Sequence, residues 1–251
     1  MNPSEQKPQV LVCGATGGIG SALARRLASR GFELTLAARD EGRLNLLATE
    51  VKSDCCLLDV TDPASVENCF TKIIEKHGRL DGVVNCVGSL LLKPAHLTTD
   101  AEWAQTITAN LTSSFYLVRA AAGRMMRSGG GSIVLMASAV ALRGMINHEA
   151  IAAAKAGVVG LAQSAAATYA RYNIRVNCVA PGLTRTPLTA SLTKNELALK
   201  GSTALHPLGR IGEPDQVASA IAWFLEPEND WVTGQVLAVD GGLSTLQPRT
   251  N

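Results

Sequence analysis

Two residues near the middle of the chain, His148 and Lys155, have types and a spacing that suit proton transfer. The stretch NHEAIAAAKAG, residues 147–157, places Lys155 among alanines and glycines, where a charged side chain is costly without a purpose. His148 lies seven residues before this lysine, and Ile151 lies four before it. On a continuous helix these positions share one face, because steps of three, four and seven residues return to the same side. A helix that began after His148 would remove this relation, and the histidine would then be a partly exposed polar residue near the helix start. Free imidazole titrates near pH ~6.5, so the pattern makes His148 a candidate proton donor beside Lys155.

A glycine-rich stretch near the N-terminus has the pattern of a phosphate-binding loop. In CGATGGIGSALARRL, Gly14, Gly18 and Gly20 stand between a strand-like run and a helix-like one. Glycines at such a junction permit a tight turn and let backbone N–H groups approach a pyrophosphate at the helix N-terminus. A glycine-rich turn without a ligand is the simpler alternative, but the strand before it and the helix after it favour a dinucleotide.

The end of the second strand-like run indicates which dinucleotide binds. NAD-specific folds usually carry an acid there, about 20 residues after the glycines, whereas an arginine accommodates the 2′-phosphate of NADP. Ala38 and Arg39 hold this edge, and a guanidinium suits a phosphate. The sequence therefore predicts NADP(H) in preference to NAD(H). Gly17 stands where a second basic residue would strengthen that prediction, and Asp40 is a candidate helix cap.

Strand-like apolar runs alternate with helical segments along the whole chain. The runs are QVLVCG, FELTLAA, DCCLLDV, DGVVNCVG, GSIVLMAS, IRVNCVAPG and GQVLAVDGG. Continuous apolar strands between helices are typical of a parallel sheet covered on both faces. The sequence predicts one α/β domain over residues 1–251, a doubly wound Rossmann fold with a seven-stranded parallel sheet and helices on both faces. Loose tails are expected at residues 1–7 and 245–251, and an irregular substrate lid at residues 184–213.

Composition limits the partners and the location of the protein. The net charge is +2 and charged residues make up 18% of the chain, without basic runs, so neither nucleic acid nor a membrane surface is expected as a partner. No signal-peptide pattern or membrane-spanning run of ~18 apolar residues is evident. The six cysteines have no zinc spacing and no CxxC motif, and five of them fall in strand-like runs that predict buried thiols. A reduced cytoplasmic protein is the expectation.

These motifs together resemble the short-chain dehydrogenase/reductase family, close to the β-ketoacyl carrier-protein reductases, over roughly residues 8–243. The resemblance rests on CGATGGIG, LDV, NCVG, TANLTSSF, APGLTRTP and TGQVLAVDGG, which occur in the family's order. It implies a cofactor site formed by Gly14, Thr16, Gly18, Ile19, Gly20, Ala38, Arg39, Asp59, Val60, Asn85, Gly88, Lys155, Pro181, Gly182, Thr184 and Thr186. It also implies a homotetramer or homodimer.

The same resemblance identifies a departure at the proton donor. The family's catalytic set is a serine, a tyrosine thirteen residues later and a lysine four beyond that. Ser138 and Lys155 match, and Asn110 matches the asparagine that holds a relay water, but the tyrosine position is Ile151. Isoleucine cannot transfer a proton, and a positioned general acid contributes ~10²–10⁴ in rate. His148 stands where the enoyl-reductase branch places its tyrosine.

Two functions therefore follow from the sequence. The first is an NADP(H)-dependent oxidoreductase acting on a carbonyl/hydroxyl or an activated C=C bond, with His148 or a relayed water as an atypical proton donor. The second is a catalytically silent NADP(H)-binding subunit or sensor. The retained Ser138 and Asn110 favour the enzyme, since a pure binder needs neither. Leucines in the predicted lid suggest an apolar or acyl-type substrate: Leu188, Leu192, Leu197, Leu199 and Leu205.

Overall fold

Seven parallel strands form one sheet in the computed structural model, which describes residues 7–247. The order across the sheet is β3-β2-β1-β4-β5-β6-β7, and every neighbouring pair is parallel. The strands are β1 Gln9–Cys13, β2 Glu33–Ala38, β3 Asp54–Leu57, β4 Gly82–Asn85, β5 Gly131–Met136, β6 Ile174–Pro181 and β7 Val236–Val239. The predicted doubly wound seven-stranded fold is confirmed.

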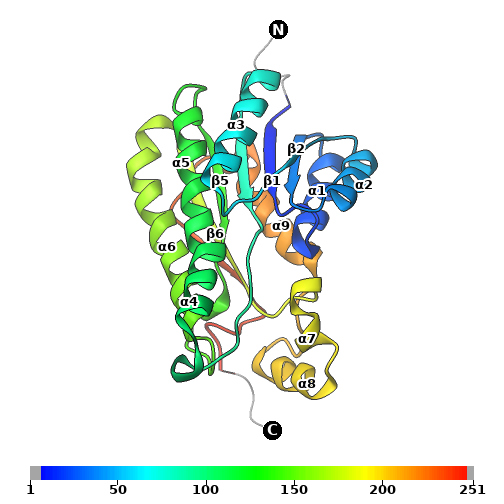
Figure 1. The fold of residues 1–251 in the computed structure, drawn as a ribbon, viewed down its shortest axis with the longest axis vertical. Helices are drawn as coiled ribbons and strands as arrows, with labels where there is room; N and C mark the ends of the chain where they lie inside the picture. Colours follow the sequence, from blue (N-terminus) through cyan, green and yellow to red (C-terminus); the bar gives the residue numbers. More distant parts are fainter. Residues whose placement is uncertain (1–6, 248–251) are drawn as a thin grey trace.

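Helices cover both faces of the sheet, as continuous apolar strands require. One buried cluster joins the sheet to α3 (Pro63–His77), α5 (Ser113–Met125) and α6 (Glu149–Tyr169), and the other joins it to α1 (Gly18–Ser29), α2 (Glu41–Val51) and α9 (Pro214–Leu225). Figure 1 shows these two layers on opposite sides of the strands. The strand order reverses between β1 and β4, so a crevice opens at the carboxyl ends of these strands, where ligands bind in such sheets.

Side-chain caps fix where three of the helices begin. The Asp40 carboxylate accepts a hydrogen bond of 3.0 Å from the Arg43 backbone N–H, which confirms the predicted cap of α2. Asp62 caps α3 in the same way, with Pro63 in its first turn. Thr99 and Glu102 form a capping box at α4 (Asp100–Ile107). A five-residue π-helix, Thr108–Thr112, then continues into α5, and such widened turns are frequent at functional sites.

Several sequence predictions are corrected by the structure. Residues 184–213 are not irregular, because α7 (Ala190–Thr193) and α8 (Glu196–Leu205) form within them and lie beyond the strand ends in Figure 1. Cys55 is exposed on β3, because this edge strand is covered on one face only. Of the predicted loose tails, residues 1–6 and 248–251 lie outside the described residues.

One helix meets the length and composition of a membrane span, contrary to the sequence expectation. It covers Glu149–Tyr172, and 44% of an apolar stretch of 18 residues within it is buried inside the protein. Alanines and glycines, rather than a run of large apolar residues, give it this apolar character. The helix packs against β6 and contributes Val158 and Ala162 to the main core, as a core helix does.

Candidate active site

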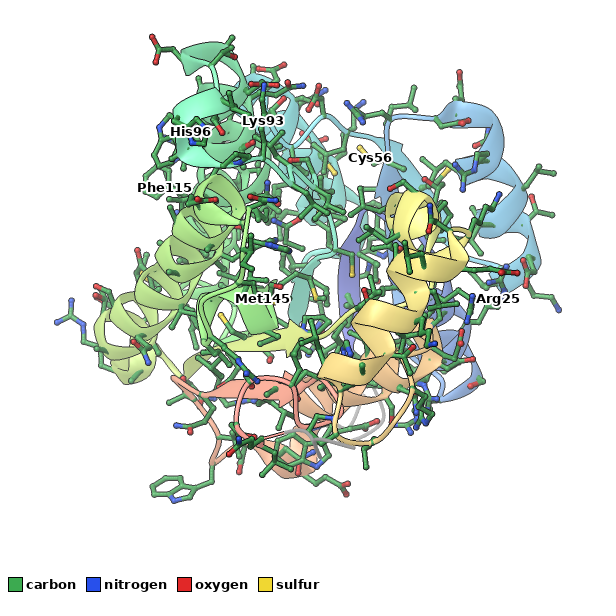
Figure 2. The ribbon with its side chains drawn as sticks, turned by 90° about the horizontal axis from the view of Figure 1, so that it is seen from below. Arg25, Cys56, Lys93, His96, Phe115 and Met145 are labelled. Carbon is green, nitrogen blue, oxygen red and sulfur yellow. The ribbon has the colours of Figure 1, made fainter. Side chains whose placement is uncertain are left out.

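A cavity of about 760 Å³ lies at the carboxyl ends of β4, β5 and β6, between these strands and α8. Figure 2 looks onto this end of the molecule, with Met145 from the loop before α6 on one side and the yellow α7–α8 segment on the other. The cavity brings together eleven of the residues selected from the sequence: Ile19, Gly88, Asn110, Ser138, His148, Ile151, Lys155, Pro181, Gly182, Thr184 and Thr186. Residues separated by more than 160 positions in the chain thus form one site.

Lys155 is the buried cation at the centre of this site. Its side chain projects from α6, and the residue is only 7% exposed. The ammonium group donates a hydrogen bond of 2.8 Å to the Met136 carbonyl at the end of β5. Burial lowers the pKa of Lys155 from its ordinary 10.5 to about 8, because a charged ammonium loses its hydration there. A lysine with this pKa can exchange a proton near neutral pH.

Asn110 anchors the loop after β4 through the π-helix. Its side-chain oxygen accepts a hydrogen bond of 3.1 Å from the Ser89 backbone N–H, and its side-chain nitrogen donates one of 2.9 Å to the Ser89 hydroxyl. A side chain on Gly88 would place Cβ 2.9 Å from the Asn110 oxygen and 3.5 Å from the Lys155 nitrogen. Glycine at position 88 therefore lets the asparagine and the lysine approach the same point. Ser89 is a site residue that the sequence reasoning missed.

Ser138 lies at the end of β5, opposite Lys155 in the cavity wall. Its hydroxyl oxygen accepts a long hydrogen bond of 3.4 Å from the Val140 N–H, as the N-cap of a short 3-10 helix. The hydroxyl proton has no acceptor among residues 7–247, so it remains available to a substrate oxygen. Both interpretations offered by the sequence, local capping and substrate binding, are compatible with this geometry.

Ile151 occupies the expected position on α6, one turn before Lys155. It is 3% exposed and contributes an apolar surface to the cavity. Within the described part of the chain, none of the three tyrosines lines the cavity. The carbonyl-facing wall thus lacks a phenol, and any proton donor must come from another residue or from water.

His148 also lines the cavity, but not in the way that the helix-face argument predicted. α6 begins at Glu149, and His148 is its N-cap with non-helical backbone angles, because the chain turns sharply at Asn147, where φ is +62°. The His148 Nδ1 lies 2.6 Å from the Ile146 carbonyl oxygen. A carbonyl accepts, so Nδ1 carries a proton and Nε2 is left free for a second partner. The histidine reaches the cavity from its rim rather than from the face of the helix.

The glycine loop has the shape that a pyrophosphate requires. Gly14 has φ +74°, and a Cβ on Gly20 would lie 2.2 Å from the Gly14 carbonyl oxygen. A Cβ on Gly18 would lie 2.9 Å from the Thr186 side chain, so this glycine lets the loop after β6 approach the start of α1. Gly17 caps α1 without a side-chain bond, and the first-turn N–H groups face this junction.

Two arginines stand at the outer edge of the cofactor region. Arg39 follows β2 directly and is exposed. Hydrogen bonds from Thr61 lower the pKa of Asp59, and the positive charge of Arg39 adds a smaller effect in the same direction. Arg43 was missed by the sequence reasoning. Its guanidinium donates a hydrogen bond of 2.6 Å to the Thr16 carbonyl in the glycine loop. The two residues are 27 positions apart, so no local sequence pattern signals the contact.

The remaining selected residues have mixed placements. The Asn85 side chain is buried and bonds to Ser114 and to the Val87 backbone, so it shapes the turn instead of lining the cavity. His206, which the sequence did not single out, is buried against the loop after β6 and accepts a 3.2 Å hydrogen bond from the Leu183 N–H. The residues outside the cavity lining are Gly14, Thr16, Gly18, Gly20, Ala38, Arg39, Asp59, Val60 and Asn85, which belong to the adjoining loops.

Known proteins resemble this chain over almost its full length. A family model described as enoyl-(acyl carrier protein) reductase matches residues 14–244. The 3-oxoacyl-[acyl-carrier-protein] reductase FabG of Thermotoga maritima is 35% identical over 240 residues, 93% of this chain and 96% of the relative. The FabG of Escherichia coli is 36% identical over 239 residues, with the same coverage.

Solved structures agree with this relationship. A short-chain type dehydrogenase/reductase from Mycobacterium ulcerans superposes with a TM-score of 0.92 at 30% identity, covering 97% of this chain and 92% of that one. A single-residue variant of the actinorhodin polyketide ketoreductase, solved with NADPH, gives a TM-score of 0.91 at 32% identity, covering 96% and 98%.

Proposed function

The chain belongs to the short-chain dehydrogenase/reductase family, and from this premise we propose that it is an NADP(H)-dependent oxidoreductase with an atypical proton donor. The substrate would be a carbonyl or alcohol, or an activated C=C bond. The observation that carries the proposal is the intact group of Lys155, Asn110 and Ser138 around a cavity whose tyrosine position is filled by Ile151. A protein that only bound the dinucleotide would not need this polar group in an apolar cavity.

The residues present fit the proposed dinucleotide. The cradle at Gly14, Gly18 and Gly20 leaves room for a pyrophosphate that side chains would fill. Arg39 and Arg43 supply two guanidinium groups at the edge where a 2′-phosphate would lie, and both side chains are exposed. When bound, NADP(H) would supply or accept the hydride. The NADPH present in the related ketoreductase structure supports this choice for the family.

Proton donation to the substrate is the step for which this chain needs a substitute for the missing tyrosine. In the proposed reduction, Ser138 holds the substrate oxygen and Lys155 stabilises the negative charge that develops on it. His148 donates the proton from Nε2 as an imidazolium and becomes the neutral Nδ1–H tautomer, in which the bond from Nδ1 to the Ile146 carbonyl keeps the ring oriented. A water between Asn110 and Lys155 is the alternative donor within the same mechanism.

The test is NADPH oxidation with a panel of β-keto thioesters, quinones, simple ketones and enoyl thioesters. Wild type, His148→Ala and the control His96→Ala would be compared, because His96 is exposed and lies away from the cavity. We expect His148→Ala to lower kcat by about 10²-fold or more and to leave the Kd for NADPH unchanged. Turnover unaffected by His148→Ala would exclude the histidine and leave the water relay.

The cofactor assignment has its own test. Arg39→Gln and Arg43→Gln should each weaken NADPH binding about tenfold and leave NADH binding almost unchanged, because only NADPH carries the 2′-phosphate. Equal losses for both dinucleotides would contradict the assignment. Arg127→Gln is a control, because Arg127 is exposed beyond α5, outside the cofactor region.

A silent NADP(H)-binding subunit is the second candidate, favoured by the buried Ile151 alone. Tight NADPH binding with no turnover in wild type over the whole panel would select it. The apolar wall of the cavity, which includes Leu188, Leu192 and Leu205, instead supports an apolar or acyl-type substrate for an active enzyme.

The outer face of α5 and α6 supports a homodimer or homotetramer. Small residues are exposed along α6, among them Ala153, Ala156 and Gly160. Phe115 on α5, labelled in Figure 2, is 45% exposed. Sedimentation should show an oligomer that Ala156→Arg disrupts, and a monomeric wild type would contradict the assignment. All six cysteines are free thiols, which supports a reducing cytoplasmic location.

A further inference from the structure

The cavity has an unbalanced charge. Its lining contains two cationic side chains, Lys155 and Arg143, and two histidines, His148 and His206. No aspartate or glutamate of residues 7–247 lines it. Most of the remaining wall is aliphatic. Its residues come from the loop after β4, the segment between β5 and α6, and residues 187–205: Leu90, Val140, Met145, Leu188, Leu192 and Leu205.

Arg143 has donors to spare inside this wall. It lies between the short 3-10 helix Ala139–Ala141 and Met145, and its side chain is half-buried. One guanidinium nitrogen donates a hydrogen bond of 2.6 Å to the Leu243 carbonyl oxygen. No carboxylate in the described part of the chain lies within ion-pair distance of it, unlike Arg25, Arg30 and Arg185, which each pair with a glutamate.

The anchoring bond gives Arg143 a fixed orientation. A guanidinium has five N–H donors in a planar fork, so the bond to Leu243 leaves a pair free to bind two oxygens side by side. A carboxylate matches that fork, and the low dielectric of an apolar cavity strengthens such a pair. Lys155 also donates one bond to a backbone carbonyl, but it adjoins the reacting centre, so its remaining donors serve the carbonyl oxygen of the substrate rather than the acid group.

We propose that Arg143 binds a carboxylate on the substrate, which makes the substrate class an apolar keto acid or hydroxy acid with its acid group free. The inference rests on the proposed function, because it names the substrate of the same cavity. The aliphatic wall holds the hydrocarbon part, Arg143 holds the acid group, and Ser138 and Lys155 lie on the same cavity to receive the carbonyl oxygen.

The test is direct binding by calorimetry, which requires no turnover and so stays informative if the proposed reaction fails. The probes are octanoate, octan-1-ol and octyl phosphate, titrated into the whole protein with and without NADP⁺. The variants are Arg143→Gln, which can still donate to the Leu243 carbonyl, and Arg143→Lys, which keeps the charge. Arg127→Gln, an exposed position away from the cavity, is the matched control.

We expect octanoate to bind wild type at least tenfold more tightly than octan-1-ol. Arg143→Gln should weaken octanoate about tenfold and leave octan-1-ol unchanged, while Arg143→Lys should keep part of the affinity.

Three outcomes would overturn the proposal. The first is equal affinity for octanoate and octan-1-ol, which includes the case in which neither binds. The second is an octanoate affinity that Arg143→Gln does not change. The third is tighter binding of octyl phosphate than of octanoate. If Arg143→Gln did not fold, the comparison of octanoate with octan-1-ol and octyl phosphate on wild type would still decide.

Discussion

Replacing Lys155 with methionine should change the pH dependence of folding in a calculable way. The lysine is 7% exposed, and burial lowers its pKa from 10.5 to about 8. Between these two pH values the unfolded chain binds a proton that the folded chain does not. Stability then rises with pH through this window, so the cost of burying Lys155 is complete below pH 8 and is lost above pH 10.5.

The size of the effect follows from the shift. At about 1.4 kcal/mol per pKa unit, lowering the pKa from 10.5 to about 8 corresponds to about 3 kcal/mol. Lys155→Met removes the titration and also the hydrogen bond to the Met136 carbonyl, which contributes a constant ~1 kcal/mol. The diagnostic quantity is therefore how the difference in unfolding free energy between variant and wild type changes with pH.

The assay is urea unfolding of both proteins without cofactor at pH 7, 8, 9 and 10, at matched protein concentration. We expect the advantage of Lys155→Met to fall by about 2–3 kcal/mol over this range. Other titrating groups cancel in the difference. Lys200→Met, at an exposed position on α8, should show no such trend. A difference that stays flat with pH would refute the argument that burial controls this lysine.

Three other substitutions or modifications test separate parts of the structure. Gly20→Ala should lower the melting temperature by several degrees, because its Cβ would lie 2.2 Å from the Gly14 carbonyl oxygen. Gly123→Ala is the control and should not lower it, because open space surrounds Gly123. Equal melting temperatures for Gly20→Ala and wild type would contradict the close contact. In a His148→Ala background, Ile151→Tyr should raise ketone reduction ~10²–10⁴-fold by restoring a general acid, and an unchanged rate would mean that the new hydroxyl does not reach the substrate. A hydrogen bond from Cys69 lowers the pKa of the half-buried Cys56 thiol to about 7. Iodoacetamide should therefore label Cys56 before the more exposed Cys55, as mass spectrometry would show. The reverse order would mean that exposure, and not the thiol pKa, controls labelling.

The fold could be predicted because its determinants are local and repeated. Each strand is an apolar run between turn residues, and helical stretches separate the strands, which admits few arrangements other than a parallel sheet. The crevice position followed from the order of elements. The lid at residues 184–213 was misjudged because its helices are short: α8 depends on the Asn195 cap and on packing over the cavity, and neither gives a strong apolar period.

The site was predicted less completely, because several of its contacts join segments far apart in sequence. Arg43 reaches Thr16 across 27 residues, and Arg143 reaches Leu243 across 100 residues, so neither pairing has a local signal. The sequence left the start of α6 open, because a helix could begin either before or after His148. Asn147 resembles a helix cap in sequence, but its positive φ places the turn there and moves the cap to His148. The backbone conformation of Asn147 thereby decides whether the His148 side chain lies on the same helix face as Ile151 and Lys155.

The change at His148 strengthens the case for chemistry at the rim of the cavity. Had α6 begun earlier, the imidazole would have shared the face of Ile151 and Lys155, deep in the wall. As the N-cap it is held instead by the Ile146 carbonyl, with Nε2 free and the ring half-exposed, where a spent donor can recover its proton from solvent. Ile151 then keeps the inner wall apolar, and the low dielectric strengthens the attraction of Lys155 for a developing oxyanion. Separating the proton source from the buried cation is consistent with both groups serving one reaction.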